Sequence, residues 1–366
     1  KGIPQAQTNT GDVRIEFYAT VRTAEPFLPV GTVIAREQSY IYTFHKDKVA
    51  QQEAAPMKET DTQVIYSGKN FKAVFDKKSG LLVSYQYNGA EYILNGQGLH
   101  PNFWRAPIDN DYGAGLGHKL GVWKEASYQD ITAASFNARN GEVTCTYQFP
   151  QTDATWDITY KIYTNGVIKV DNRFVAANEK TPMIPRIGLR MQMPETFTTL
   201  TYYGRGPEEN YRDRRTSQFF GEYSTPIKKM YEPYIRPQEN NHRTDIYWCA
   251  LTNKSGAGLL LVADRTFEMN ASNYPLETLD SGDDLHNAAP RTAQTNHRHL
   301  TDPKPEKMVD LFIDYRMMGV GGDNSWGALA HEPYLIRTGA QNAVEYGFTL
   351  VPFGRKTDFR NLIYQY

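Results

Sequence analysis

FKAVFDKKSGLLVSYQYNGAEYIL, residues 71–94, decides the fold class because it reads as consecutive β-hairpins. Apolar and polar residues alternate along it, and the alternation is interrupted at Ser79-Gly80 and again at Asn88-Gly89. A period of two with glycine-containing interruptions is typical of antiparallel strands joined by tight turns. The stretch therefore predicts a meander of strands.

The same pattern recurs along the rest of the chain. Asn-Gly pairs at 140–141 and 165–166 each precede an alternating segment, and further alternating segments follow at 187–193, 309–317 and 345–353. The last of these is expected to end the sheet. Because strands do not alternate with helices, we predict a large, all-β, antiparallel fold and exclude a (β/α)8 barrel.

Three regions depart from the repeated hairpins. Residues 12–42 read as two long strands joined by a proline-containing connection. Residues 45–61 are polar and lack alternation, so they are interpreted as a linker. Residues 273–288 predict a short helix that turns Leu276 and Leu279 inward.

Composition restricts the classes of function. The 366 residues carry 40 Lys+Arg against 41 Asp+Glu, a net charge of −1, so no overall field attracts nucleic acid or an anionic membrane. Cys145 and Cys249 are the only cysteines, which excludes a disulfide scaffold. The opening KGIPQAQTNT is neither a methionine start nor a signal peptide, so we expect a chain that begins inside a longer protein and assign no compartment.

A polar cluster, Asp109, Asn110 and Asp111, precedes a run of spaced glycines. Such side chains hold turns by binding nearby backbone groups, and the glycines favour a mobile loop. A calcium loop would need more oxygen ligands and a terminal glutamate, which are absent. We interpret the cluster as a structural turn.

Adjacent carboxylates occur at Glu208 and Glu209 within an arginine-rich segment. Two carboxylates about 5 Å apart serve retaining glycosidases as acid and nucleophile. Neighbours on an extended segment point to opposite faces, however, and arginines lower the pKa of carboxylates where a general acid needs a raised one. An ion-paired corner is the preferred interpretation.

His297 and His299 lie two residues apart. On a strand this spacing would place both on one side, which suits a metal. No third ligand follows at a suitable spacing, so we favour histidines satisfied by their neighbours and predict no metal site.

GGDNSW, residues 321–326, combines two glycines and polar residues with one large aromatic ring. Alone, it predicts a turn whose indole covers the core, because most tryptophans pack inside proteins. The alternative is a loop that presents Trp326 to a ligand.

In combination, these segments resemble the C-terminal region of glycoside hydrolase family 2 β-galactosidases of the lac type. FWRAPIDNDYG, YYGRGPEENYRDR, MYEPYIRPQENNHR, NHRHL and MGVGGDNSWG occur in family order, and the resemblance runs from about residue 62 to the end. It implies a β-galactosidase small-chain domain over residues 61–366, an antiparallel super-sandwich similar to galactose mutarotases. Residues 1–60 would be the remnant of an immunoglobulin-like domain plus a linker.

The resemblance also implies a parent enzyme that hydrolyses terminal β-galactosides with retention, using two glutamates and Mg²⁺ on a barrel that this chain lacks. The chain alone is then expected to be inactive and to hold no catalytic residue. Its contribution would be an active-site wall in which Trp326 stacks on the sugar, which reverses the packing interpretation. The implied mobile loop contains Asp111, Gly113, Gly115 and Gly117, and the implied neighbours are Asn110, Asp323, Asn324, Ser325 and His299.

Two other classes of function stay open. An aldose mutarotase or epimerase would need a histidine acid and a glutamate base on the concave face of the sheet, with His297 or His299 available. A non-catalytic carbohydrate-binding module is the other. The expected partners are a galactoside, the remaining domains of the parent and further copies of the parent, without nucleic acid or a membrane.

Overall fold

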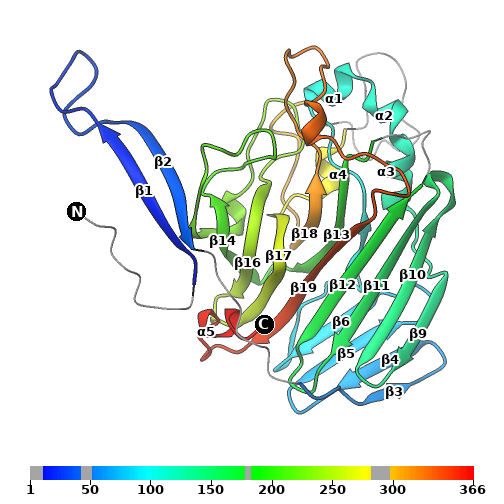
Figure 1. Ribbon diagram of the computed structural model, residues 1–366. Helices are drawn as coiled ribbons and strands as arrows, with labels where there is room; N and C mark the ends of the chain where they lie inside the picture. The colour runs from blue at the N-terminus through cyan, green and yellow to red at the C-terminus, as the bar shows by residue number, and fades with distance from the viewer. Residues whose placement is uncertain (1–10, 43–51, 178–182, 282–296) are drawn as a thin grey trace. The chain divides into compact units, whose positions relative to one another are not determined.

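The computed structural model describes residues 11–42, 52–177, 183–281 and 297–366, which are mostly antiparallel strands (Figure 1). The predicted all-β antiparallel class is confirmed. Two compact units are present, Lys1–Gln51 with Arg360–Tyr366 and Gln52–Phe359. No helix in the described part of the chain is long and apolar enough to cross a membrane.

The first unit contains the two long strands predicted over residues 12–42. They are β1 (Val13–Thr20) and β2 (Val33–Tyr42), which pair antiparallel. The short helix α5 (Arg360–Ile363) belongs to the same unit.

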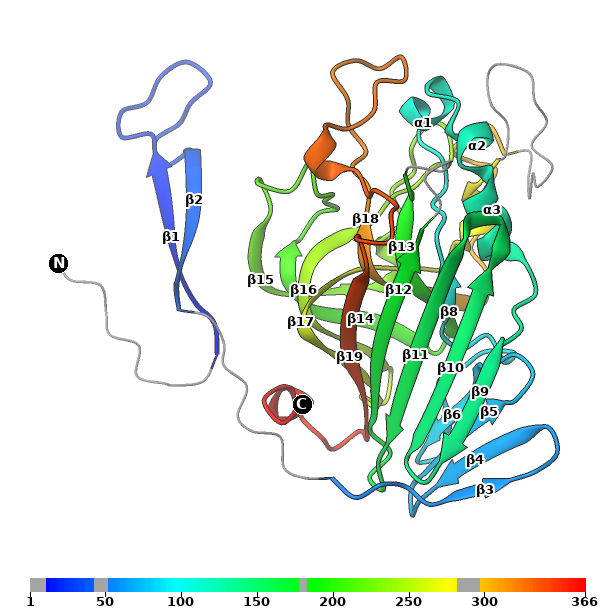
Figure 2. The ribbon, with the colours of Figure 1, turned by 45° about the vertical axis from the view of Figure 1, so that its right-hand side comes forward.

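The second unit is built on a twelve-stranded sheet in the order β15-β14-β16-β17-β19-β12-β11-β10-β9, to which β18, β13 and β8 are joined through β17. Figure 2 shows how strongly this sheet curls. Its strands are β8 (His100–Asn102), β9 (Ser135–Arg139), β10 (Glu142–Phe149), β11 (Ala154–Ile162), β12 (Ile168–Ala176), β13 (Arg186–Pro194), β14 (Phe197–Gly206), β15 (Phe219–Pro226), β16 (Arg243–Asn253), β17 (Gly258–Ser272), β18 (Met308–Met317) and β19 (Val344–Phe353).

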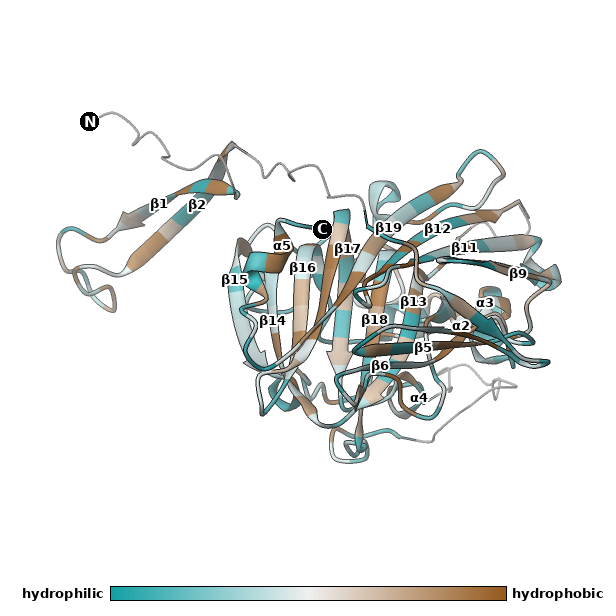
Figure 3. Cartoon of the chain, turned by 90° about the horizontal axis from the view of Figure 1, so that it is seen from below, coloured by the Kyte–Doolittle hydropathy of each residue, from teal (hydrophilic) through white to brown (hydrophobic). Residues whose placement is uncertain are grey.

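A five-stranded sheet covers one part of the large sheet, as seen from below in Figure 3. The Phe75 and Tyr160 rings meet across the two sheets with centroids 5.0 Å apart, and the Tyr85 hydroxyl donates to the Gly166 carbonyl at 2.6 Å. The predicted hairpins at residues 71–94 are confirmed. The strands are β3 (Met57–Glu59), β4 (Gln63–Ser67), β5 (Phe71–Asp76), β6 (Leu82–Tyr87) and β7 (Ala90–Glu91).

The segment interpreted as a linker is partly structured. Ala55 is fully buried, and its amide donates to the Ile162 carbonyl at 2.9 Å. Strand β3 follows at residues 57–59. The compact units divide between residues 51 and 52, whereas the sequence placed the boundary at residues 60–61.

The helices are short. They are α1 (Asp109–Gly113), α2 (Leu116–Lys119), α3 (Gly121–Tyr128) and α4 (Leu276–Leu279), with 3-10 turns at Pro150–Thr152, Ile227–Lys229 and Glu332–Tyr334. Helix α4 confirms the helix predicted near residue 276, since Leu276 and Leu279 are both buried. Residues 282–288 of that prediction lie outside the described residues.

Strand β19 lies at the centre of the large sheet. It is the last strand along the chain, but it pairs with β12 on one side and with β17 on the other. The expectation that residues 345–353 end the sheet is therefore wrong, because β19 lies between two other strands and not at an edge. The neighbours of β19 come from residues 168–174 and 258–263, so no local pattern could reveal this position.

Strand β17 changes partner partway along its length. Its first part pairs with β19 up to Ala263, and its last part pairs with β18 from Glu268 onward. Between them, Asp264, Arg265 and Thr266 are exposed within an otherwise buried strand. The sheet therefore forks at this point, with β18 and β19 on its two branches.

Buried ion pairs join β13 to β18. Arg186 lies 2.7 Å from Asp314, and Arg190 lies 2.7 Å from Asp310, with all four side chains at most 4% exposed. Burial is costly for an unpaired charge, so these arginines and aspartates depend on each other.

Candidate substrate-binding surface

Trp326 is exposed on the loop that follows β18. Its side chain is 86% exposed, whereas the other four tryptophans, at 104, 123, 156 and 248, are buried. An indole that covers the core would be buried, so the packing interpretation of GGDNSW is wrong for this residue.

The backbone around Trp326 is held by two asparagine side chains. The Asn324 side-chain oxygen accepts hydrogen bonds from the backbone amides of Trp326 at 2.8 Å and Ala328 at 3.3 Å. Asn110, on α1, donates its side-chain amide to the carbonyls of Asn324 at 3.0 Å and Ala328 at 3.1 Å. The structure thus brings together the DND and GGDNSW segments, which the sequence separates by more than two hundred residues.

Glycines allow these two segments to approach each other closely. A Cβ on Gly113 would lie 2.7 Å from the Trp326 carbonyl oxygen, and one on Gly327 would lie 2.4 Å from the Gly113 carbonyl carbon. Gly327 also has a φ of +107°, which side-chain-bearing residues rarely adopt. Both positions therefore require glycine.

Asp213 supports the start of the loop. Its carboxylate accepts hydrogen bonds from the amides of Val320 at 3.1 Å and Gly321 at 2.7 Å. Asp213 lies in the arginine-rich segment that follows Glu208 and Glu209, and no pattern within that segment indicated this role. Of the other predicted neighbours, Ser325 is exposed, and Asp323 contacts His331 at 2.8 Å on the surface.

A buried ion pair fixes α1 beneath the loop. Arg105 donates to Asp111 through Nε at 3.0 Å and Nη2 at 2.8 Å, and its Nη1 donates to the Met318 carbonyl at 2.7 Å. Burial alone would lower the pKa of Arg105, but the charge and hydrogen bonds of Asp111 raise it above its ordinary value. Asp111 also accepts from the Ile108 amide at 3.1 Å, so it binds a nearby backbone group, although at the start of helix α1 and not in the predicted turn.

The glycine-containing segment after the DND cluster is not an irregular loop. Gly113 ends α1, Gly117 lies within α2, and Gly115 joins the two helices with a φ of +66°. The five helical residues of α1 and the four of α2, on the two sides of Gly115, are too few for a sequence pattern to separate from a turn. That this segment moves stays a prediction.

A second polar cluster connects α1 to the segment near His297. The Tyr112 ring lies under the Arg236 guanidinium at 3.6 Å, and its hydroxyl is 3.1 Å from the Ser281 hydroxyl. Arg298 also reaches Ser281 through Nη1 at 3.4 Å. Sequence reasoning missed Arg236 and Arg298 because their partners are distant along the chain.

The two histidines of NHRHL do not form a metal pair. They lie outside strands, His297 contacts the Thr278 carbonyl at 2.8 Å through Nδ1, and His299 is exposed. Within the described ranges, no group of three His, Cys, Asp or Glu side chains is placed to hold a metal. Among the residues that the structure describes, no hydrogen bond or ion pair joins the His299 side chain to the Trp326 loop.

Glu208 and Glu209 have different surroundings. Glu209 pairs with Arg214 at 2.5 Å and accepts from the Asn241 amide at 2.7 Å, which confirms the ion-paired corner for this residue. Glu208 is exposed and takes no part in these bonds. The arrangement is structural and does not resemble an acid and nucleophile flanking a substrate.

The mutarotase alternative gains no support from the histidines proposed for it. The polar pocket of the large sheet is lined by Glu268 but by neither His297 nor His299. The nearest histidine to this carboxylate is His242 at 3.0 Å, and its side chain is fully buried.

Comparisons with the sequences of known proteins agree on one family. A sequence model described as "Beta galactosidase small chain" matches residues 67–350. A β-galactosidase of Priestia megaterium is 33% identical over 302 residues, covering 82% of this chain and 27% of the relative. A β-galactosidase of Streptococcus thermophilus is 30% identical over 332 residues, covering 88% of this chain and 30% of the relative.

The chain thus spans less than a third of the length of these two relatives. Among solved structures, an aldose epimerase homologue from C. elegans matches 82% of this chain and 99% of its own at 10% identity with a TM-score of 0.39. A galactose 1-epimerase from Lactobacillus acidophilus matches 82% of this chain and 97% of its own at 5% identity with a TM-score of 0.37. Both scores are too low to carry an argument. The family match extends over most of the chain and includes the DND cluster and the Trp326 loop, so the chain belongs to the β-galactosidase small chain family.

Proposed function

We propose that this chain is the C-terminal part of a β-galactosidase that hydrolyses terminal, non-reducing β-D-galactose residues with retention. The relatives that share the family are named β-galactosidases, and the matched region covers 27% and 30% of their length. In this proposal the chain supplies one wall of the active site, and the catalytic residues belong to the remaining domains of the parent.

The exposed Trp326 indole is the observation that carries the proposal. A pyranose has an apolar C–H face that an indole can cover while the hydroxyl groups stay hydrated. The indole is 86% exposed, and its backbone is held by Asn324 and Asn110. A loop fixed in this way presents the ring without a large loss of conformational entropy on binding.

The catalytic groups are assigned to the rest of the parent. The Glu209 carboxylate is occupied by the ion pair with Arg214 at 2.5 Å and by the Asn241 amide at 2.7 Å, so it serves the corner and is not free to face a substrate. The described residues offer no metal site, so they do not fit the Mg²⁺ expected in the parent, and we place that ion in the proposed barrel. The isolated chain should therefore leave a chromogenic β-galactoside unhydrolysed.

The first unit is proposed to be the remnant of an immunoglobulin-like domain of the same parent. Phe17, Tyr18 and Ile34 of its two strands are 54%, 54% and 61% exposed. Two strands alone are marginally stable, and apolar side chains of this size are normally covered by further strands. Further strands of the parent would supply that cover.

Trp326→Ala in the full-length parent tests the proposed wall. Loss of one stacked ring should weaken galactoside binding by about 1–3 kcal/mol, or roughly 5- to 150-fold. KM for a chromogenic galactoside should rise accordingly, and Trp326→Phe should retain part of the affinity. Unchanged KM and kcat in Trp326→Ala would remove this residue from the site, and galactosidase turnover by the isolated chain would contradict the division of labour.

A further inference from the structure

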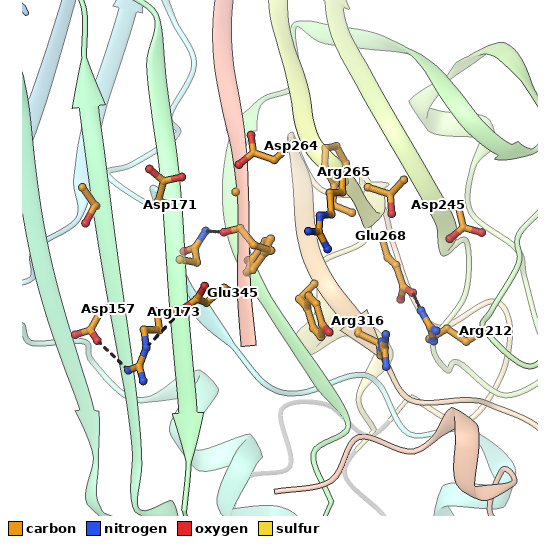
Figure 4. Close-up of a pocket in the computed structure, with 17 residues that line it drawn as sticks. Asp157, Asp171, Arg173, Arg212, Asp245, Asp264, Arg265, Glu268, Arg316 and Glu345 are labelled. Carbon is orange, nitrogen blue, oxygen red and sulfur yellow. Dashed lines mark hydrogen bonds and ion pairs between the residues drawn. The ribbon is translucent and has the colours of Figure 1, made fainter. Parts of the chain in front are cut away.

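A pocket of about 860 Å³ opens at the fork of the large sheet, where β17 changes partner from β19 to β18 (Figure 4). The exposed residues Asp264, Arg265 and Thr266 form part of its wall. Its volume lies within the range of about 300–1,000 Å³ that is usual for small-molecule sites. None of its lining residues belongs to the Trp326 loop.

The lining is unusually polar for a ligand site of this size. Six carboxyl groups and four guanidinium groups line it, beside two partly exposed tyrosines, Tyr315 and Tyr346, whose rings are 6.1 Å apart. Most small-molecule sites are lined mainly by apolar side chains. A lining of this kind suits a hydrophilic ligand that also offers an apolar face to the tyrosines.

One side of the pocket has an excess of carboxylates. Arg173 lies between Asp157 at 3.9 Å and Glu345 at 3.7 Å, so a single guanidinium faces two acidic groups at long range (Figure 4). Asp264 shares Lys169 with Asp171, at 2.7 and 2.8 Å respectively. These carboxylates keep capacity to accept further hydrogen bonds.

The other side holds arginines with unused donors. The Nε atoms of Arg212 and Arg316 are buried and have no hydrogen-bond partner among the described residues. Arg212 pairs with Glu268 at 3.2 Å through Nη1, and Arg316 lies over the Tyr315 ring at 5.1 Å. Arg265 is exposed and makes no hydrogen bond or ion pair within the same set of residues. Buried donors normally find a partner, so this side is short of acceptors.

We propose that this pocket binds a neutral saccharide of about disaccharide size. Sugar hydroxyl groups both donate and accept, so one ligand can accept from the exposed Arg265 and the partly exposed Arg316 and donate to the carboxylates opposite. An anion would satisfy the arginines, but it would face a lining in which carboxylates outnumber guanidiniums. The apolar face of a pyranose fits against Tyr315 and Tyr346.

The proposal does not depend on the function proposed for Trp326. The two surfaces share no residue, and they are built from different parts of the fold, the loop after β18 and the fork between β18 and β19. Variants can therefore separate them.

Binding is measured on the 366-residue chain by saturation-transfer NMR titration with lactose and cellobiose, and with sodium phosphate and sodium glucuronate as anionic probes. Arg265→Ala and Arg316→Ala should each weaken disaccharide binding roughly tenfold, the size expected for losing a hydrogen bond to a charged group. Arg355→Ala is the matched control, because Arg355 is an exposed arginine of the same unit outside the pocket lining.

The expected result is saturable disaccharide binding that falls in both pocket variants and is unchanged in Arg355→Ala. Melting temperatures within a degree or so of the parent chain confirm that each variant is folded. Binding of the anions alone, or no saturable binding of either disaccharide, overturns the proposal. Binding that is lost in Trp326→Ala and kept in both arginine variants also overturns it, while supporting the function proposed for the loop.

Discussion

Asp111→Ala tests whether a buried ion pair holds α1 under the Trp326 loop. The change removes the acceptor of two hydrogen bonds from Arg105, at 3.0 and 2.8 Å, and of one from the Ile108 amide at 3.1 Å. It leaves a guanidinium that is 2% exposed without its counter-charge. Removing one partner of a buried pair costs about 3–5 kcal/mol of unfolding free energy. Arg105 keeps its bond to the Met318 carbonyl, so we expect a loss near the lower end of that range.

The assay is urea unfolding followed by tryptophan fluorescence, with linear extrapolation to water. Glu332→Ala, which removes the exposed pair with Arg337, is the control and should change the unfolding free energy little. The double variant Arg105→Met/Asp111→Leu should recover most of the loss, because an apolar pair replaces an unpaired charge. A loss below about 1 kcal/mol in Asp111→Ala, as for a surface pair, would refute this reasoning. A double variant as unstable as the single one would do the same.

Two further predictions concern a close backbone contact and a partly buried histidine. Gly113→Ala should displace the Trp326 loop, because the new Cβ would lie 2.7 Å from the Trp326 carbonyl oxygen, and hydrogen exchange at the Trp326 amide should become faster. Gly117→Ala is the control, because a Cβ at this position in helix α2 would have no neighbouring atom within 4 Å. Equal rates of hydrogen exchange at the Trp326 amide in the two variants would argue against the contact. Burial, and then the charge of Arg190, lower the pKa of His100 to about 4 from an ordinary 6.5. Between pH 6.5 and pH 4 the unfolded chain therefore gains a proton at this residue that the folded chain does not. The unfolding free energy should fall as the pH drops through this range. His100→Gln should flatten that fall in pH-dependent urea titrations, and an unchanged slope would show that His100 does not cause it.

Local turn chemistry explains which parts of the fold were predictable. The Asn-Gly pairs at 140–141 and 165–166 do join β9 to β10 and β11 to β12, because the glycines at 141 and 166 have φ of +70° and +89°. Strand β13 shows the limit of alternation. Arg186 and Arg190 alternate with apolar residues and would read as a solvent-facing row, yet both are buried against aspartates of β18. These two arginines are buried because the sheet curls, and the alternation of apolar and polar residues carries no information about that curl.

In the candidate site, too, local features were predictable and contacts between distant segments were not. The Trp326 loop could be singled out from its glycines and its aromatic ring, but the residues that hold it could not. Asn110 reaches Asn324 across 214 positions, and Asp213 reaches Gly321 across 108. Contacts at such separations depend on the finished fold, so only ordered family motifs, and no spacing rule, placed the DND cluster near the loop.

The central position of β19 has a consequence for how the chain is made. During synthesis, β12 and β17 leave the ribosome long before residues 344–353, so each must wait with one long edge unpaired. Open edges on a half-built sheet invite pairing with other chains, and contacts this distant in sequence form slowly. A deletion that removes β19 would take out the middle of the sheet and not its margin, so nascent or shortened chains should depend on chaperones far more than the stability of the finished sheet suggests.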